Sequence, residues 1–494
     1  MFLVKKYLPL LIVITYFILQ VPFLTADPET NVEPLMRGAW TDEGLYSSQI
    51  RNLIDHGHFD IKENTTFIRG PVYNIIQAPF YFVFGTSFLV NRLIVLLITI
   101  FVLYLFLREE KLRNFGIFLT LFAFLQFRVF HFAHFGMPEM ICVDFVLLSL
   151  YFLLKMIDLQ NEKKKIWMTF YSSLFLFLCY TSKIQYLYVS AILPATMFFI
   201  SLADSFKEKE IRWDQYKIFI YSLFFSIVLA AVYYIIWYLP NKEFYDYIMK
   251  SETGGRYSNT FKEIRLTAQF NYEHVLWVKE LKAFIAHFYI VLTVAAVFFI
   301  IKRKRTPLSI IALFSIIWVV IEIHKIPGIY IPYRYLISMF FAAGVFIASV
   351  YSAFAFHFKK MAILIFIIAI IFGIYNFNYY FDSVRSRTYC LTSVNDYMAR
   401  YDLKNKSVIG PWASSVCWKS KSTTFPVWNK YLNWEDPIKK FKPVAIVSEI
   451  GETDSDLAYK SQGIILDSIS DSCRVFNVWN TKIGIFWVNL ELIN

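Results

Sequence analysis

Long apolar runs separated by short polar segments occupy the first 380 residues of the chain. A helix that crosses the hydrocarbon core of a bilayer needs about 20 mainly apolar residues. Eleven segments satisfy this requirement: 7–26, 87–107, 115–135, 139–157, 166–183, 186–204, 217–239, 282–301, 307–323, 334–356 and 361–380. The pattern predicts a polytopic α-helical membrane protein with about 11 transmembrane helices.

The basic residues between these runs predict how the chain is oriented. If the N-terminus is cytoplasmic and the spans alternate, the strong basic runs all fall on the cytoplasmic side, as the positive-inside rule requires. These runs are Arg108/Lys111/Arg113, Lys163–Lys165, Lys207/Lys209/Arg212/Lys217, Lys302–Arg305 and Lys359–Lys360. We therefore expect a multi-pass plasma (inner) membrane protein. Its first span is expected to be an uncleaved membrane helix, and its C-terminus extracytoplasmic.

The orientation leaves three long segments outside: two loops, residues 27–86 and 240–281, and a tail, residues 381–494. In the first loop we expect a helix from Thr41 to the His56–Gly57 stop, then an interfacial helix over 71–85. In the second loop we expect an amphipathic helix near 261–277. The tail has short apolar runs at 407–409, 444–447, 463–466 and 483–488, which predict a small α/β domain. Residues 1–380 and 381–494 are thus predicted to be two domains.

Composition and cysteine usage agree with a membrane protein. Hydrophobic residues make up 57% and charged residues 17% of the 494 residues, whereas soluble chains have roughly 45–50% and 25%. The net charge of +12 sits in short runs between apolar segments, which argues against nucleic-acid binding. Cys142 and Cys179 are expected in the core. Of Cys390, Cys417 and Cys473, two could pair in the outer tail, but spacing does not indicate which.

Asp42 and Glu43 are the first candidate catalytic residues. They are adjacent acids on an outer loop, near a predicted helix start. An ionised carboxylate there can act as a general base on a hydroxyl. The alternative is structural, because acids in the first turn of a helix interact favourably with its dipole.

Four cations on the outer side form a second candidate group: Arg69, Arg92, Lys183 and Arg334. Charges at membrane depth are costly, and outer cations run against the positive-inside rule. Together they predict binding of an anion such as a lipid phosphate, with arginine suited to bidentate contacts. The alternative is that each one extends to the headgroups.

His131, His134 and Glu139 form a third candidate group, a divalent-metal or acceptor site. The two histidines are three residues apart and share a helix face, and Glu139 follows at the turn into the next span. The alternative is that the histidines face lipid headgroups.

Six motifs occur in order over residues 1–355. They are Trp40–Thr41–Asp42–Glu43–Gly44–Leu45–Tyr46, Arg69–Gly70–Pro71–Val72–Tyr73, Asn91–Arg92–Leu93, Met137–Pro138–Glu139, Thr181–Ser182–Lys183 and Arg334–Tyr335–Leu336. Together they resemble the polyprenyl-phosphate-sugar-dependent GT-C glycosyltransferases, in particular the protein O-mannosyltransferase and aminoarabinose transferase group. The tail is similar to the outer C-terminal domains of many members.

The resemblance implies a GT-C fold and an inverting transfer of a sugar from a polyprenyl phosphate to an acceptor hydroxyl of a protein, lipid or glycan. It implies Asp42 as base, Glu43 as an orienting residue, and the cation group as the binding site for the donor phosphate. The aminoarabinose transferases have an acid and a lysine before two prolines, whereas this chain has Ile68, Arg69 and a single Pro71. The resemblance thus implies the reaction class and leaves the sugar open.

Two other functions use the same features. A transporter or flippase of a lipid-linked sugar would also need outer cations, together with charges deep in several spans and broken helices. A non-catalytic assembly subunit would use the tail to bind a partner.

Overall fold

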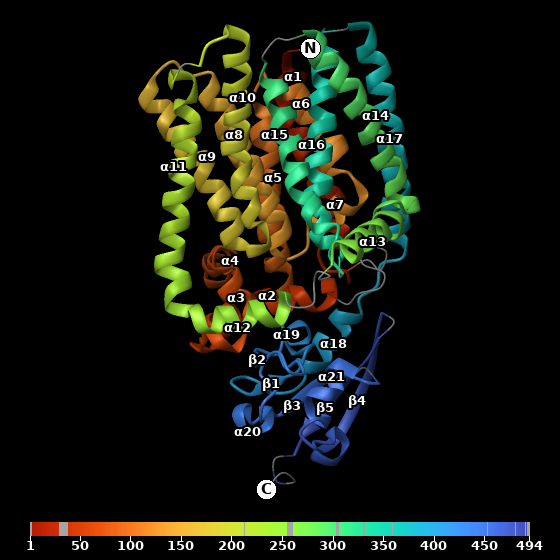
Figure 1. The fold of residues 1–494 in the computed structure, drawn as a ribbon. Coiled ribbons are helices and arrows are strands. Elements are labelled where there is room, and N and C mark those ends of the chain that lie inside the picture. Colours follow the sequence, from red (N-terminus) through yellow and green to blue (C-terminus); the bar gives the residue numbers. More distant parts are fainter. Residues whose placement is uncertain are drawn as a thin grey trace.

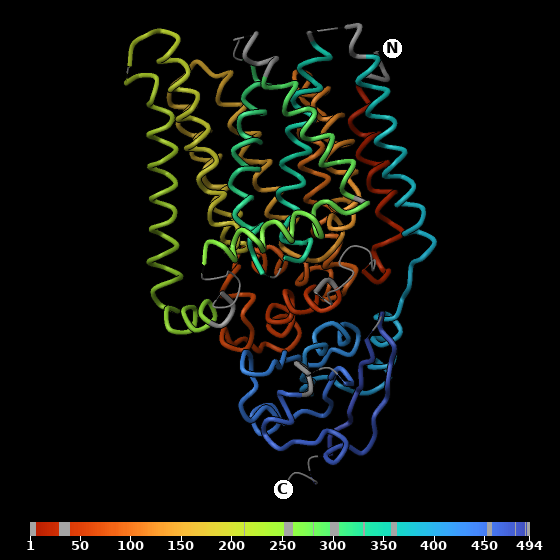
Figure 2. Tube along the Cα trace, turned by 45° about the vertical axis from the view of Figure 1, so that its right-hand side comes forward, coloured from red at the N-terminus to blue at the C-terminus, as the bar shows by residue number. Residues whose placement is uncertain are grey.

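The computed structural model describes residues 2–28, 38–211, 213–253, 260–302, 306–329, 331–357, 359–451, 453–479, 481–489 and 491. Long helices run side by side in a bundle, and a sheet domain covers one end of it (Figure 1). The N-terminus lies at the opposite end of the bundle from this C-terminal domain (Figure 2).

The bundle helices follow the predicted apolar runs. They are α1 (Phe2–Gln20), α5 (Phe88–Arg108), α8 (Pro138–Ile157), α9 (Glu162–Ser182), α10 (Ile192–Glu208), α11 (Trp213–Tyr233), α14 (Lys279–Lys302), α15 (Pro307–Glu322), α16 (Tyr333–His357) and α17 (Lys359–Arg385). Within the described residues, eight helical segments are long and apolar enough to cross a membrane, and 113–124 and 281–296 are shorter apolar helices. The protein is a multi-pass membrane protein.

The predicted span over 115–135 is not one continuous helix. It consists of α6 (Arg113–Leu119), a π-helical turn η3 (Thr120–Phe124) and α7 (Phe127–Phe132). Gln126 caps the N-terminus of α7, because its side chain accepts a hydrogen bond from the Val129 amide. Asn376 on α17 accepts a hydrogen bond from the Phe127 amide. The prediction of a single helix is wrong here because side-chain amides replace the helical partners of these backbone groups.

The connections on the N-terminal side of the bundle pack against one another through ion pairs. Lys111 contacts Asp158 at 2.7 Å, and Lys155 contacts Glu109 at 2.6 Å. The basic connection after α5 and the one after α8 therefore lie at the same end of the bundle. Arg212 and residues 303–305, which belong to other basic runs, lie outside the described residues.

A layer of shorter helices lies between the bundle and the C-terminal domain (Figure 1). It contains α2 (Gly38–His56), η2 (Ile61–Glu63), α3 (Thr65–Arg69), α4 (Pro71–Phe84), α12 (Lys242–Thr253) and α13 (Phe261–Asn271). The expected helices over 71–85 and near 261 are present. The helix expected from Thr41 begins earlier, at Gly38, and ends at His56 before Gly57, whose φ is +67°. Asp42 and Glu43 consequently lie beyond the first turn, where the dipole explanation is weak.

The C-terminal domain is built on a mixed five-stranded sheet of order β2-β1-β3-β5-β4. Its strands are β1 (Ser407–Ile409), β2 (Thr423–Phe425), β3 (Ala445–Glu449), β4 (Ser470–Val478) and β5 (Thr481–Val488). Its helices are α18 (Cys390–Met398), α19 (Ala413–Val416), α20 (Pro437–Phe441) and α21 (Thr453–Lys460). Strand β1 is parallel to β2 and β3, and β5 is antiparallel to β3 and β4.

Three of the four apolar runs of the tail lie in strands of this sheet. The run at 463–466 instead leads into a short 3₁₀ helix, η9 (Leu466–Ile469). Cys390, Cys417 and Cys473, whose pairing the sequence left open, are free thiols, as are Cys142 and Cys179.

Helix α2 holds the C-terminal domain against the bundle. Arg51 donates to the Ser414 carbonyl at 2.8 Å. Asn52 pairs with both backbone groups of Thr424, at 3.1 and 3.2 Å. The helix can approach this closely because Gly44 has no side chain: a Cβ there would lie 2.5 Å from the Ser414 backbone.

Replacing Gly44 with alanine is therefore expected to loosen the domain and lower stability by about 1–3 kcal/mol, the usual cost of overpacking. Trypsin cleavage between α17 and α18, measured on the purified protein, should become faster. Gly373→Ala on α17 is the matched control, because a Cβ there meets nothing within 4 Å. Equal cleavage rates in the two variants would contradict this close-packed interface.

Candidate active site

A buried carboxylate contacts a buried arginine where α2 meets the first turn of α16. Asp42 Oδ2 lies 3.2 Å from Arg334 Nε, and the two side chains are 16% and 7% exposed. Burial raises the pKa of Asp42, while the charges of Arg334, Lys183 and Arg69 act in the opposite direction. Asp42 thus contacts Arg334 and is influenced by the charges of two more of the four predicted cations.

A second buried ion pair lies beside the first. Lys183, just past the end of α9, contacts Glu139 at the start of α8 at 2.5 Å. The ammonium also lies 5.3 Å from the ring centroid of Tyr46 and 5.0 Å from that of Tyr335. Because Arg334 lies 5.2 Å from the same Tyr335 ring, two cations flank one aromatic side chain.

The chain reversal between α3 and α4 brings Arg69 to this cluster. A Cβ on Gly70 would lie 2.1 Å from the Ser182 carbonyl oxygen, so glycine is required for the reversal to pack over the end of α9. Arg69 donates to the backbone and side-chain oxygens of Thr65 at 3.1 and 2.8 Å. Arg69, Lys183 and Tyr46 line a small cavity.

Glu43 and Arg92 form a separate, fully internal pair. Arg92 binds both carboxylate oxygens of Glu43, at 2.9 and 2.6 Å, and donates to the Phe23 and Ala26 carbonyls at 2.6 and 2.7 Å. Glu43 also accepts from the Gly136 amide at 2.7 Å. The structure therefore separates Arg92 from the three cations near Asp42: it ties α5 to α2 and to the end of α1.

Within the described part of the chain, His131, His134 and Glu139 do not come together as metal ligands. His134 Nδ1 is 2.7 Å from Gln20 Oε1, and the His131 ring packs edge-on against Phe23. Glu139 faces Lys183. Across the described residues, no group of three or more His, Cys, Asp or Glu side chains could hold a metal ion. The turn at 133–137 points the two histidines and the glutamate to different neighbours.

A third buried pair, Glu322 and Lys325, had no assigned role in the sequence. The two side chains contact at 2.5 Å, and Lys325 donates to the Tyr335 carbonyl at 3.2 Å. Glu322 accepts from Ser338, which in turn accepts from Trp318. This network supports the turn of α16 that carries Arg334. The sequence signal for this ion pair was a pair of opposite charges three residues apart at the end of an apolar run.

Removing the Ser338 hydroxyl should weaken this network. Ser338→Ala is expected to cost about 1–3 kcal/mol, because the buried Trp318 N–H and a Glu322 oxygen lose their partner. Ser349→Ala is a matched control on the same helix, where the hydroxyl bonds only its own helix at Phe346. Thermal unfolding in detergent would measure both, and an equal fall in the two variants would argue against the network.

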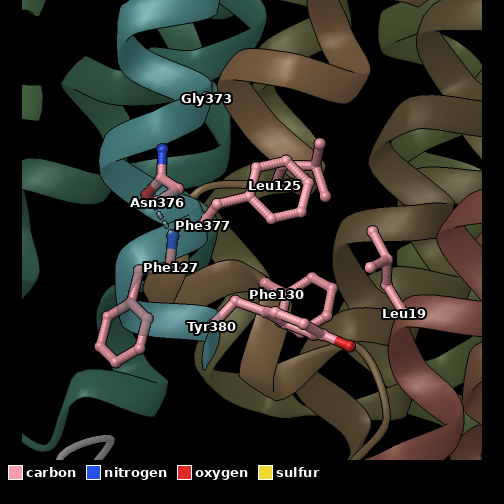
Figure 3. Close-up of a pocket in the computed structure, with 8 residues that line it drawn as sticks. All are labelled: Leu19, Leu125, Phe127, Phe130, Gly373, Asn376, Phe377 and Tyr380. Carbon is pink, nitrogen blue, oxygen red and sulfur yellow. Dashed lines mark hydrogen bonds between the residues drawn. The ribbon is translucent and has the colours of Figure 1, made fainter. Parts of the chain in front are cut away.

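A small apolar cavity lies elsewhere, between α1, α7 and α17 (Figure 3). Leu19, Leu125, Phe130, Phe377 and Tyr380 line it. Its one amide, Asn376, is engaged with the backbone at Phe127 and Phe372. Among the described residues, no carboxylate or cation lines this cavity, so the ionisable candidate residues lie elsewhere.

The fold is similar to that of solved membrane enzymes. No family model and no curated protein sequence matches the chain. It aligns with ArnT from Cupriavidus metallidurans bound to undecaprenyl phosphate over 96% of this chain and 97% of that one, at 13% identity and a TM-score of 0.60. It also aligns with the Archaeoglobus fulgidus oligosaccharyltransferase tethered with an acceptor peptide, over 99% of this chain and 75% of that one, at 12% identity and a TM-score of 0.50. These likenesses confirm the expected GT-C fold.

Proposed function

We propose that the protein is a membrane glycosyltransferase that moves a sugar from a polyprenyl-phosphate donor to an acceptor hydroxyl. The observation that carries this proposal is Asp42, a buried carboxylate held beside Arg334 with Lys183 and Arg69 close by. A base next to an anion-binding group is what such a displacement requires. The undecaprenyl phosphate bound to the Cupriavidus protein of the same fold supports the donor class.

In the proposed reaction, Asp42 takes the proton from the acceptor hydroxyl as its oxygen attacks the anomeric carbon. The bond between that carbon and the phosphate oxygen breaks, and the lipid phosphate leaves with the electron pair. A single displacement inverts the anomeric centre. The lipid phosphate is a good leaving group, so the step needs no protein acid.

The charge that develops on the phosphate would be stabilised by Lys183, Arg334 and Arg69. Arginine has five N–H donors in a planar fork, so Arg334 can hold Asp42 and still bind a phosphate oxygen. Lysine acts as a point charge. Glu139 would keep Lys183 in place until the donor arrives.

We place the reaction on the extracytoplasmic face of the plasma (inner) membrane. The support is the positive-inside rule, together with the position of the C-terminal domain and α2 at the end opposite the N-terminus (Figure 2). The acceptor hydroxyl would therefore approach from the side of the C-terminal domain.

Purified protein in detergent, supplied with a panel of radiolabelled polyprenyl-phosphate sugars, tests this function. Wild-type protein should consume one donor, which identifies the sugar. Parallel reactions with a chelator decide whether a divalent metal takes part. If no donor is consumed while the protein moves the same lipid across liposome bilayers, it is a flippase and the proposed function is wrong.

A further inference from the structure

A wide groove with a volume of about 510 Å³ lies away from the cluster around Asp42, between the end of α2 and the C-terminal domain. Ligand pockets commonly have volumes of about 300–1,000 Å³ and favour the junctions of domains. Three parts of the chain line this groove: residues 56–63, strands β1 and β2, and helix α20.

Hydrogen bonds between residues 56–63 and the C-terminal domain fix the walls of the groove. His56 Nδ1 lies 3.0 Å from Asn405 Oδ1, and Asn433 donates to the Glu63 carbonyl at 2.7 Å. Because both walls are fixed in this way, a ligand would meet a preformed site and little ordering would be needed on binding.

The lining suits a ligand that carries hydroxyl groups. Asn405, Ser407 and Thr423 contribute amide and hydroxyl groups, which donate and accept hydrogen bonds at once. Phe425 and Phe441 also line the groove and stack on each other, with ring centroids 4.3 Å apart and planes 20° apart. A lining that combines polar groups with aromatic rings matches a sugar ring, which has hydroxyl edges and apolar C–H faces.

The charges in the groove do not favour an anion. Glu63 pairs with His58 at 2.8 Å, and the Lys440 ammonium donates to Asn433 at 3.0 Å. One carboxylate thus offsets one ammonium, and the described residues that line the groove include no arginine fork of the kind that selects phosphate or acidic chains.

The geometry also disfavours a peptide added as a strand. Strand β2 is the edge of the sheet nearest the groove, and an extended peptide would have to pair with its backbone. The Asn52 amide already occupies both the N–H and the carbonyl of Thr424, at the centre of β2. This edge is therefore closed by α2.

We propose that this groove binds a neutral oligosaccharide, and that the oligosaccharide is the acceptor. The second part rests on the proposed function. Asp42 and His56 lie on the same helix, α2. The two residues are 14 positions apart, which is a rise of about 21 Å at 1.5 Å per residue. A single sugar cannot bridge that distance, so the acceptor is a glycan chain several units long whose growing end reaches Asp42.

Titration calorimetry on the full-length protein in detergent tests the binding directly. The probes are neutral tetrasaccharides (mannotetraose, maltotetraose and xylotetraose), an acidic decapeptide and inorganic phosphate. The variants are Ser407→Phe, which fills the groove, and Lys440→Met, which removes a donor from its wall. Lys439→Met is the matched control, since Lys439 is exposed on the same helix and lies outside the lining.

Wild type should bind one of the tetrasaccharides. Ser407→Phe should abolish binding, and Lys440→Met should weaken it about tenfold, the effect of one lost charged hydrogen bond, with Lys439→Met unchanged. Melting curves establish that each variant is folded. No tetrasaccharide binding, binding that survives both groove variants, or binding of only the peptide or phosphate would overturn the proposal.

The same titration on Asp42→Asn separates this inference from the proposed function. Glycan binding by that variant with no donor consumption in wild type would leave the binding site standing and remove the transferase. Donor consumption without glycan binding would support the transferase and remove the proposed glycan site.

Discussion

Asp42→Asn protein is expected to consume donor at least about 10²-fold more slowly than wild type, because loss of a general base typically costs 10²–10⁴ in rate. The amide keeps the shape of the carboxylate but cannot take the proton from the hydroxyl group of the acceptor. The initial rate of loss of lipid-linked label at saturating donor measures the effect.

A surface carboxylate provides the control for this variant. Asp396→Asn removes an exposed acid that pairs with Lys419 at 2.5 Å, and its activity should match wild type. Full activity in Asp42→Asn would remove Asp42 from the mechanism and leave the cation cluster as a binding site only.

The pH dependence of kcat/KM should report the same group. The base acts when it is deprotonated, so activity rises with pH through the pKa of Asp42. Burial raises this pKa above the ordinary carboxyl value, so the acidic limb should lie at higher pH than about 3.9. Arg334 lowers the pKa, so Arg334→Leu should move the limb to still higher pH. A limb that stays in place in this variant would show that Asp42 does not titrate in it.

Arg92→Met is expected to destabilise the protein by about 3–5 kcal/mol, the usual cost of leaving one member of a buried ion pair unpartnered. Arg92 is fully buried, Glu43 is 2% exposed, and the two contact at 2.6 Å. Removing the guanidinium leaves the buried Glu43 carboxylate without its cation and two backbone carbonyls without their donor. Unfolding in detergent, followed by tryptophan fluorescence, measures the loss.

Two companion variants make this prediction specific. Arg113→Met is the matched control, because Arg113 lies 4.0 Å from a largely exposed Glu110 and such pairs contribute about 0.2–1 kcal/mol. Adding Glu43→Gln to Arg92→Met should recover part of the stability, since no charge is then left buried. If Arg92→Met melts like wild type and raises the KM for donor, Arg92 binds the donor phosphate, as the sequence alone suggested.

Much of the fold could be predicted from the sequence because the bilayer imposes a simple rule. Apolar runs of about 20 residues become helices wherever they enter lipid, since each backbone group must find a partner within its own segment. The rule fails over 115–135, where side chains as distant as Asn376 supply those partners. Short strands such as β2 were missed because three residues in a polar stretch carry no periodic signal.

The candidate site shows the same division between sequence and structure. The sequence by itself determined the membrane helices and singled out the acids and cations that meet on α2, α8, α9 and α16. It could not assign partners among them. Adjacent residues on a helix point about 100° apart, so Asp42 and Glu43 face different neighbours. Only the tertiary structure decided that Asp42 contacts Arg334 while Glu43 contacts Arg92 inside the core. The reason is that helix packing sets which side chains lie within reach of one another.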